Sequence, residues 1–210
     1  ISAFRANEDE SKVPAYTLPD PLRMEDGRPV ETARQWRRER RPEVLGLFRE
    51  QMYGHRPGVP EGMRFEVRTE EPAALGGMAT RREVRVFLGP GAEAPYLDLL
   101  LYVPNQRRGR VPAFLGLNFE GNHAVTREPG VTITTRWVAN NAREGREGNR
   151  ATEVSRGSEA SRWPVEKIVQ RGYALATVYY GDLEPDHREG WKEGVRSQFA
   201  VRARGVRVEP

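Results

Sequence analysis

Two apolar runs joined by one helix-like segment constrain the fold of this chain more than any other feature. VPAFLGLN fills residues 111–118 and YALATVY fills residues 173–179, and both are apolar enough to be strands inside a sheet. A helical pattern runs from Pro164 to Arg171, and Gly172 ends it. This order favours a parallel pair of strands with a right-handed crossover. The sequence therefore predicts an α/β fold, with run 111–118 buried on both faces.

Three more strand-like patterns precede the first run. Residues 64–69 and 81–88 alternate between apolar and polar, and residues 96–103 are strongly apolar. Gly76-Gly77 and Gly89-Pro90-Gly91 mark turns between them. Antiparallel strands followed by a crossover are the pattern of the first half of an α/β-hydrolase sheet.

The N-terminal part of the sequence lacks strand patterns. Residues 1–30 are polar and interrupted by prolines, which predicts an extended arm. Apolar residues recur at helical spacing over residues 32–53, where Pro42 is placed to divide the segment into two helices and Gly54 to cap its end. We expect an arm over residues 1–30 and an α/β-hydrolase portion over residues 31–210.

The composition argues against a membrane span, a nucleic-acid interface and any site that needs cysteine. The sequence has no run of 18 apolar residues, so we expect no membrane span. The net charge is only +4 and nearly all basic residues are arginine, so a nucleic-acid interface is disfavoured despite the basic isoelectric point. With no cysteine, disulfides and thiolate metal sites are impossible. The start lacks both Met and an apolar signal, which fits a chain whose leader was removed or one that begins inside a longer sequence.

Polar clusters follow both apolar runs. NFEGNH covers residues 118–123 and YGDLEPDH covers residues 180–187, and each contains a histidine and an acid. Ligands of open α/β sheets bind at the carboxyl ends of strands, where the first cluster would lie beside an oxyanion. The oxyanion-side candidates are Asn118, Glu120, Gly121, Asn122 and His123. The alternative is a glycine-containing turn held by asparagine side chains.

No catalytic nucleophile is recognisable. A serine hydrolase of this fold needs G-x-S-x-G, or a close variant, on a sharp turn after a strand. RGSEASRWP is the nearest match, but a polar loop precedes it, and its hydroxyls are better placed to cap the next helix. None of the serines has the required setting: Ser2, Ser11, Ser155, Ser158, Ser161 and Ser197.

Metal and acid–base chemistry receive weaker support. The three histidines show neither HxH nor HExxH spacing, so a metal site needs His123 and His187 to meet with nearby acids. The acids near the predicted strand ends are Glu120, Asp182, Glu184 and Asp186. Carboxylates at strand ends either catalyse or pair with the abundant arginines, and pairing is the simpler interpretation. We therefore expect no metal and no cofactor.

Three segments together resemble a known family. FLGLNFEGNHAV, RGSEASRWPVEKIVQRGYALATVYYGDLEPDH and GVRSQF are similar to carbohydrate esterase family 15, the glucuronoyl esterases, particularly its bacterial branch, over residues 14–200. The resemblance implies a three-layer α/β-hydrolase sandwich and a Ser–His–acid triad without metal. It implies cleavage of the ester between the (4-O-methyl)glucuronic acid of xylan and lignin alcohols.

The sequence departs from the family in one large respect. The family nucleophile lies in a G-C/H-S-R-x-G-K type of motif, which is absent here together with the triad histidine and acid. The resemblance therefore implies an N-terminal half of a secreted or periplasmic esterase, completed by a further segment or a second chain. The substrate-cleft candidates are Arg156, Trp163, Asp182 and His187.

Two other functions stay open. One is a different carbohydrate esterase of the same fold, such as an acetyl-xylan esterase. The other is a non-catalytic carbohydrate-binding module, which the aromatic content permits.

Overall fold

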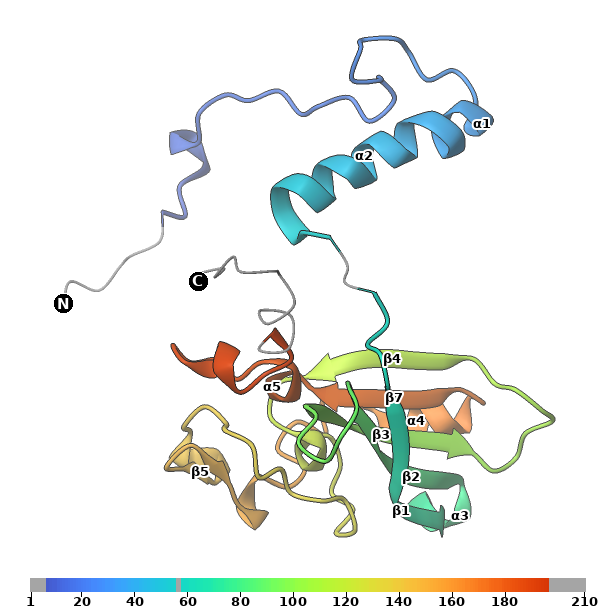
Figure 1. Ribbon diagram of the computed structural model, residues 1–210, viewed down its shortest axis with the longest axis vertical. Coiled ribbons are helices and arrows are strands. Elements are labelled where there is room, and N and C mark those ends of the chain that lie inside the picture. The colour runs from blue at the N-terminus through green and yellow to red at the C-terminus, as the bar shows by residue number, and fades with distance from the viewer. Residues whose placement is uncertain (1–6, 56–57, 197–210) are drawn as a thin grey trace. The chain divides into compact units, whose positions relative to one another are not determined.

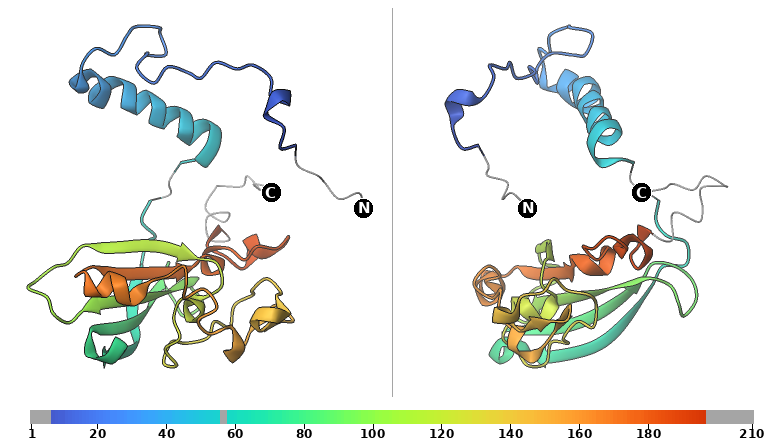
Figure 2. Two further views of the ribbon diagram at one scale, coloured as in Figure 1. Left: turned by 180° about the vertical axis from the view of Figure 1, so that it is seen from behind. Right: turned by 90° about the vertical axis from the view of Figure 1, so that its left-hand side faces the viewer.

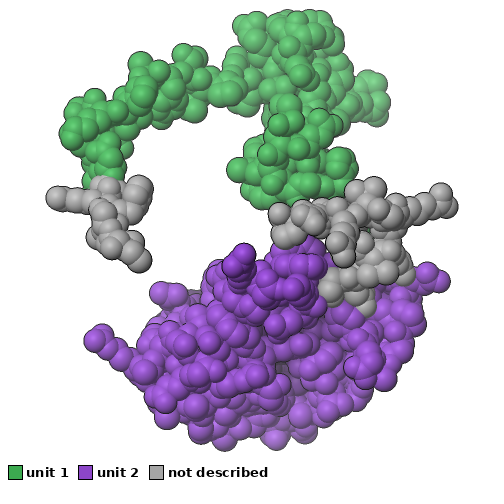
Figure 3. Space-filling model, turned by 60° about the vertical axis from the view of Figure 1, so that its left-hand side comes forward, with its two compact units in different colours: residues 1–58 green, residues 59–210 purple. Residues whose placement is uncertain are grey.

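The chain divides into two compact units. The computed structural model describes residues 7–55 and 58–196, and the units comprise residues 1–58 and 59–210 (Figure 3). The sequence placed its boundary after residue 30, whereas here the helical segment groups with the arm. Ser2 and the Ser197–Phe199 end of the GVRSQF motif lie outside the described residues.

The first unit is an extended arm followed by one continuous helical segment, whereas Pro42 had predicted two helices. Its elements are η1 (Glu10–Lys12), α1 (Ala33–Gln35), η2 (Trp36–Arg40), α2 (Arg41–Phe48) and η3 (Arg49–Tyr53). The Thr32 hydroxyl accepts the Gln35 amide at 3.1 Å and caps the start, and Gly54 ends the helix with a φ of 72°. Pro42 occupies the first turn of α2 and does not divide the segment. Among the described helices, none has the length and apolar character needed to cross a bilayer.

The second unit contains a mixed sheet of five strands in the order β1-β2-β3-β7-β4 (Figure 1). The strands are β1 (Arg64–Ala73), β2 (Ala79–Phe87), β3 (Tyr96–Pro104), β4 (Ala113–Asn118) and β7 (Ala174–Tyr179). The pairs β1–β2, β2–β3 and β3–β7 are antiparallel. The pair β4–β7 is parallel, with Ala113 opposite Ala174 and Asn118 opposite Tyr179. The predicted strands, crossover helix and parallel pair are confirmed.

Short elements connect the strands. They are α3 (Ala74–Gly77), η4 (Asn122–Val125), η5 (Ala142–Glu144), β5 (Arg146–Glu147), β6 (Arg150–Ala151), η6 (Glu153–Ser155), α4 (Val165–Gln170), α5 (Tyr180–Leu183) and η7 (Gly190–Lys192). The long polar segment between β4 and α4 is therefore ordered by single turns and the small β5–β6 hairpin, although its sequence resembles a loop.

The two faces of the sheet are covered unequally. One face carries the core, in which Leu100, Tyr102 and Leu175 pack with Val165 and Val169 of α4. Views from other directions show α4 beside the strands of this face (Figure 2). The opposite face exposes large apolar side chains: Phe65, Val67, Leu115 and Leu117. A sheet buries both faces in a complete α/β domain, so this face lacks its covering layer among the described residues.

The exposure of strand β4 differs from what the sequence predicted. The sequence predicted burial on both faces, but β4 is an edge strand, and Leu115 is 76% exposed. Its composition is that of an interior strand, with no charge between Ala113 and Leu117. Strand β1 at the other edge is interrupted by a bulge near Arg68 and carries charged side chains, which protect an edge from pairing.

A partly buried carboxylate connects the sheet to the segment that covers it. Glu128 accepts hydrogen bonds from the Leu75 amide at 2.9 Å, the Tyr102 hydroxyl at 2.6 Å and the Arg81 guanidinium at 3.0 Å. Burial and the Glu128 hydrogen bond raise the pKa of Tyr102. The hydroxyl is therefore held as a donor to Glu128.

We expect Glu128→Gln to lower the free energy of unfolding by about 2–4 kcal/mol, because a buried donor loses its acceptor in either amide orientation. One orientation places the amide nitrogen against Arg81 and Tyr102, and the other places it against the Leu75 amide. Urea unfolding measures the change. Glu147→Gln, at an exposed position, is the control, with an expected change within about 0.5 kcal/mol. Equal midpoints for the two variants would contradict this role of Glu128.

Candidate functional site

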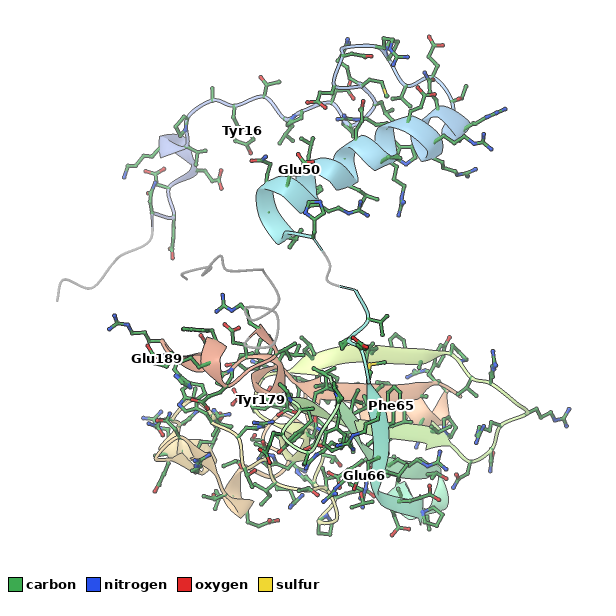
Figure 4. The ribbon with its side chains drawn as sticks, in the orientation of Figure 1. Tyr16, Glu50, Phe65, Glu66, Tyr179 and Glu189 are labelled. Carbon is green, nitrogen blue, oxygen red and sulfur yellow. The ribbon has the colours of Figure 1, made fainter. Side chains whose placement is uncertain are left out.

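The candidate site lies where β4 and β7 end. The segment 119–125, including η4, follows β4, and α5 follows β7. Figure 1 shows both strands ending on the side of the sheet where β5 and α5 lie, and Figure 4 labels Tyr179, the last residue of β7. The predicted meeting of the two polar clusters at one end of the sheet agrees with this arrangement.

Two asparagines fix the turn after β4. The side-chain amide nitrogen of Asn118 donates to Asn122 Oδ1 at 2.8 Å and to Thr177 Oγ1 at 3.0 Å. Its side-chain oxygen, Oδ1, accepts a hydrogen bond from the Gly121 backbone N–H at 2.9 Å. Asn122 in turn donates to the Asp98 carbonyl at 2.7 Å. The turn is therefore tied to β7 and β3, and the Gly121 N–H already has an intramolecular acceptor.

Glu120 forms an ion pair, the simpler of the two interpretations of this acid, although the sequence did not indicate which arginine is its partner. Its carboxylate meets the guanidinium of Arg146, which also donates to Glu144 at 2.7 Å. The Arg146 residue is only 4% exposed, and burial lowers the pKa of its guanidinium. Because Arg146 belongs to β5, this pair holds the small hairpin against the end of β4.

His123 and Ser155 form a hydrogen-bonded pair that resembles a catalytic dyad. The His123 Nε2 atom lies 2.8 Å from Ser155 Oγ, but both residues are fully buried. The Ser155 hydroxyl donates to the Thr152 carbonyl at 2.5 Å, so its proton is not directed at the histidine. Burial, and then repulsion by Arg156, lower the pKa of His123 to about 4. A fully buried, weakly basic imidazole cannot activate a serine for substrate attack.

Asp182 lines a small polar cavity of about 140 Å³, together with Arg85, Asp98 and Arg136. Its carboxylate accepts the Asp98 amide at 2.9 Å, while the Arg136 Nε atom stays 3.8 Å away. Burial raises the pKa of Asp182 to about 6. Among the described residues, Arg136 Nε has no hydrogen-bond partner, so its attraction offsets little of the cost of burying the carboxylate.

The other predicted cleft residues have internal contacts. Arg156 donates to the carbonyls of Glu128 at 2.9 Å and Val131 at 2.7 Å. Trp163 packs against the core at β4, where a Cβ on Gly116 would come within 3.2 Å of its ring. Trp163 also lines an open pocket of about 640 Å³ over α4. Asn118, Gly121, Asn122 and His123 thus contact one another, whereas Glu120 pairs with Arg146 and Trp163 packs beside Gly116.

His187 lies in a different setting from His123. Its ring stands 5.2 Å from the Trp137 ring, centroid to centroid, and its Nε2 atom is 3.5 Å from Glu193. In residues 7–55 and 58–196, no three His, Asp or Glu side chains converge on a position for a metal ion.

The site as described can hold and orient part of a substrate, but none of its described residues is a nucleophile at the end of a strand. Among the described serines, none follows β4 or β7 directly. Sequence reasoning missed Arg136 and Arg146, which lie in the polar segment after β4. Nothing in NNAREGREGNR separates a buried arginine from the solvated ones around it.

We expect Asp182→Asn to raise the free energy of unfolding by about 1–2 kcal/mol at pH 7.5. The folded pKa lies above the ordinary value of 3.8, so Asp182 destabilises the fold increasingly as the pH rises from about 4 to about 6. Asparagine keeps an acceptor for the Asp98 amide without a charge. The gain should therefore vanish near pH 4.

Urea midpoints of the variant and the parent chain, compared at each pH, measure this effect. The lowered pKa of His123 makes stability change in the opposite direction over a similar pH range, but it contributes equally to both proteins. Asp186→Asn removes an exposed charge from the same segment and serves as the control. A gain for Asp182→Asn that is equal at pH 4 and pH 7.5 would refute the explanation.

Comparison with known proteins gives close relatives that are longer than this chain. No family model matches the sequence. The carbohydrate esterase MZ0003, from an unknown prokaryotic organism, is 46% identical over 182 residues. The alignment covers 86% of this chain and 41% of that protein.

Comparison with solved structures also finds similar proteins that are longer than this chain. A glucuronoyl esterase from Solibacter usitatus matches with a TM-score of 0.80 and 45% identity, over 91% of this chain and 47% of that one. A promiscuous CE15 esterase from a marine bacterial metagenome matches with a TM-score of 0.80 and 42% identity, over 95% and 49% of the two chains. A CE15 glucuronoyl esterase from Teredinibacter turnerae, at 22% identity and a TM-score of 0.63, shares the fold.

These matches confirm the α/β-hydrolase fold, of which the mixed sheet forms a part. The chain spans less than half the length of each of these relatives, which is consistent with the N-terminal half that the motifs implied. In sequence and in fold, the chain is similar to about half of a glucuronoyl esterase of carbohydrate esterase family 15, as its motifs indicated.

Proposed function

We propose that this chain forms the non-nucleophilic half of a carboxylic ester hydrolase that acts on glucuronoyl esters. The observation that carries the proposal is the 45% identity and TM-score of 0.80 to a glucuronoyl esterase over nearly the whole chain. The substrate would be the ester between the (4-O-methyl)glucuronic acid of xylan and a lignin alcohol. Because a plant cell-wall polymer is too large to enter a cell, the protein would act outside the cytoplasm, secreted or periplasmic.

In this proposal the reaction is divided between two segments. A serine of the completing segment attacks the ester carbonyl, and a histidine supported by an acid takes the serine proton and passes it to the alcohol as the ester C–O bond breaks. Water, deprotonated by the same histidine, then cleaves the acyl-enzyme, which releases the glucuronic acid and returns the proton to the serine. The present chain supplies the sheet and the segment 119–125 beside the reacting carbonyl. The turn after β4 supports this role because the hydrogen bonds of Asn118 and Asn122 fix its backbone, so that the segment need not reorganise when an oxyanion develops beside it.

A chimaera tests the function directly. We expect the 210 residues, joined to the part of the Solibacter usitatus enzyme that they do not match, to hydrolyse benzyl glucuronate. The 210-residue chain alone should release no product, because none of its described serines stands at a strand end. Release of glucuronic acid measures both. Hydrolysis by the chain alone would contradict the division of the site.

A broader ester specificity is the second candidate, since one close structural match is described as a promiscuous esterase. Acetylated xylan as a substrate for the same chimaera separates the candidates. Faster turnover of the acetyl ester than of the glucuronate ester would favour an acetyl-xylan esterase.

The proposal requires a surface on which the completing segment pairs, and the edge of β4 has the necessary features. Its exposed side chains are apolar, and it lacks the bulge and charges of β1. A flat apolar edge next to an uncovered sheet face suits another strand and its helical layer.

We expect Leu115→Lys to abolish co-purification of the chain with a co-expressed completing segment, because the charge would be buried beside the added strand. Val154→Lys in η6 is the matched control, because Val154 is apolar and as exposed as Leu115 (74% against 76%) but does not belong to the sheet. Affinity co-purification measures the outcome. Equal recovery with both variants would show that β4 is not the pairing edge.

A further inference from the structure

The hydrogen bonds around His123 determine which of its ring nitrogens carries the proton. A serine hydroxyl has a single proton, and that of Ser155 is donated to the Thr152 carbonyl at 2.5 Å. The 2.8 Å contact between Ser155 Oγ and His123 Nε2 therefore needs the proton on Nε2. Burial, which lowers the pKa of His123 to about 4, keeps the imidazole neutral at neutral pH. His123 is thus a neutral donor to Ser155.

The other side of the imidazole contacts the turn after β4. Gly121 has a φ of 99°, and a Cβ added there would lie 2.7 Å from Cε1 and 2.8 Å from Nδ1 of His123. Only glycine fits between the ring and the backbone at this point. The position of the imidazole therefore limits the path of the backbone through residue 121.

Backbone hydrogen bonds join the same two segments. The Gly157 amide donates to the His123 carbonyl at 3.0 Å, and the Glu159 amide donates to the Ala124 carbonyl at 2.9 Å. Together with the His123–Ser155 bond, these contacts form a clasp between η4 and residues 152–159. The clasp holds the turn from outside the sheet, whereas Asn118 and Asn122 hold it from the sheet itself.

We infer that His123 is a positioning residue for the proposed ester hydrolysis, acting through Ser155 to fix the backbone of residues 119–121 at the end of β4. The inference rests on the proposed function. His123 is fully buried and touches no substrate in this role. A shift of the backbone by a fraction of an ångström would weaken transition-state stabilisation more than substrate binding. Its loss should therefore lower kcat and leave KM nearly unchanged.

The clasp is tested first without reference to activity, in the 210-residue chain. Ring-nitrogen NMR at pH 7 should show a protonated Nε2 and an unprotonated Nδ1 for His123. Ser155→Ala should accelerate amide hydrogen exchange at Gly157 and Glu159 by about tenfold, which corresponds to about 1.4 kcal/mol of local opening. Ser158→Ala is the matched control, because Ser158 Oγ is buried nearby with no hydrogen-bond partner among the described residues. A protonated Nδ1, or equal exchange in the two variants, would overturn the clasp.

The positioning role is tested next in the chimaera with benzyl glucuronate. Ser155→Ala and His123→Phe should lower kcat about tenfold with KM within twofold, while Ser158→Ala stays within twofold in both. His123→Gln should recover most of kcat, because its side-chain amide can place a donor near the position of Nε2. Unchanged kcat in Ser155→Ala despite faster exchange would overturn the positioning role.

The two tests also separate this inference from the proposed function. An inactive parent chimaera would contradict the proposed function and with it the positioning role. The NMR and exchange measurements would still decide whether the clasp exists.

Discussion

The partly buried carboxylate of Glu128 is the interaction on which the arrangement of the second unit depends. It accepts hydrogen bonds from Leu75 of α3, Arg81 of β2 and Tyr102 of β3. Glu128 itself lies near the start of the segment that covers one face of the sheet. The same residue's carbonyl accepts Arg156, which neighbours the Ser155 that contacts His123. Hydrogen bonds thus run from the sheet to the turn at the end of β4. A polar segment with few apolar residues is held in place mainly by such bonds, because it buries too little apolar surface to be held by packing alone.

Sequence reasoning predicted the elements of the sheet well, for identifiable physical reasons. Alternation of apolar and polar residues, and continuous apolar runs, indicate which segments can be strands. Pro164 and Gly172 mark the two ends of the crossover helix. The composition of β4 is that of an interior strand, and the burial that it predicted is wrong for this chain, because β4 is an edge strand with exposed apolar side chains. The error has a clear source: composition reports the environment for which a strand is suited, whereas exposure depends on what else is present to cover it.

The site was predicted less completely than the fold. The polar clusters after β4 and β7 were located from the rule that ligands bind at the carboxyl ends of strands. The partners of those clusters were not, since Arg146 and Ser155 come from the long polar segment, far from Glu120 and His123 in the sequence. Pairings of this kind depend on the path of a segment that has no periodicity. Local patterns contain no information about that path.

The strand order has a consequence for the sequence of events in folding. Strands β1, β2 and β3 pair with their immediate neighbours along the chain, so this meander closes through local contacts. Strand β7 lies between β3 and β4 in the sheet, although it follows both in the sequence. Among the described residues, β4 pairs only with β7, so β4 cannot join the sheet until β7 has been inserted. During synthesis, the turn that follows β4 therefore exists long before the strand that gives it a fixed position.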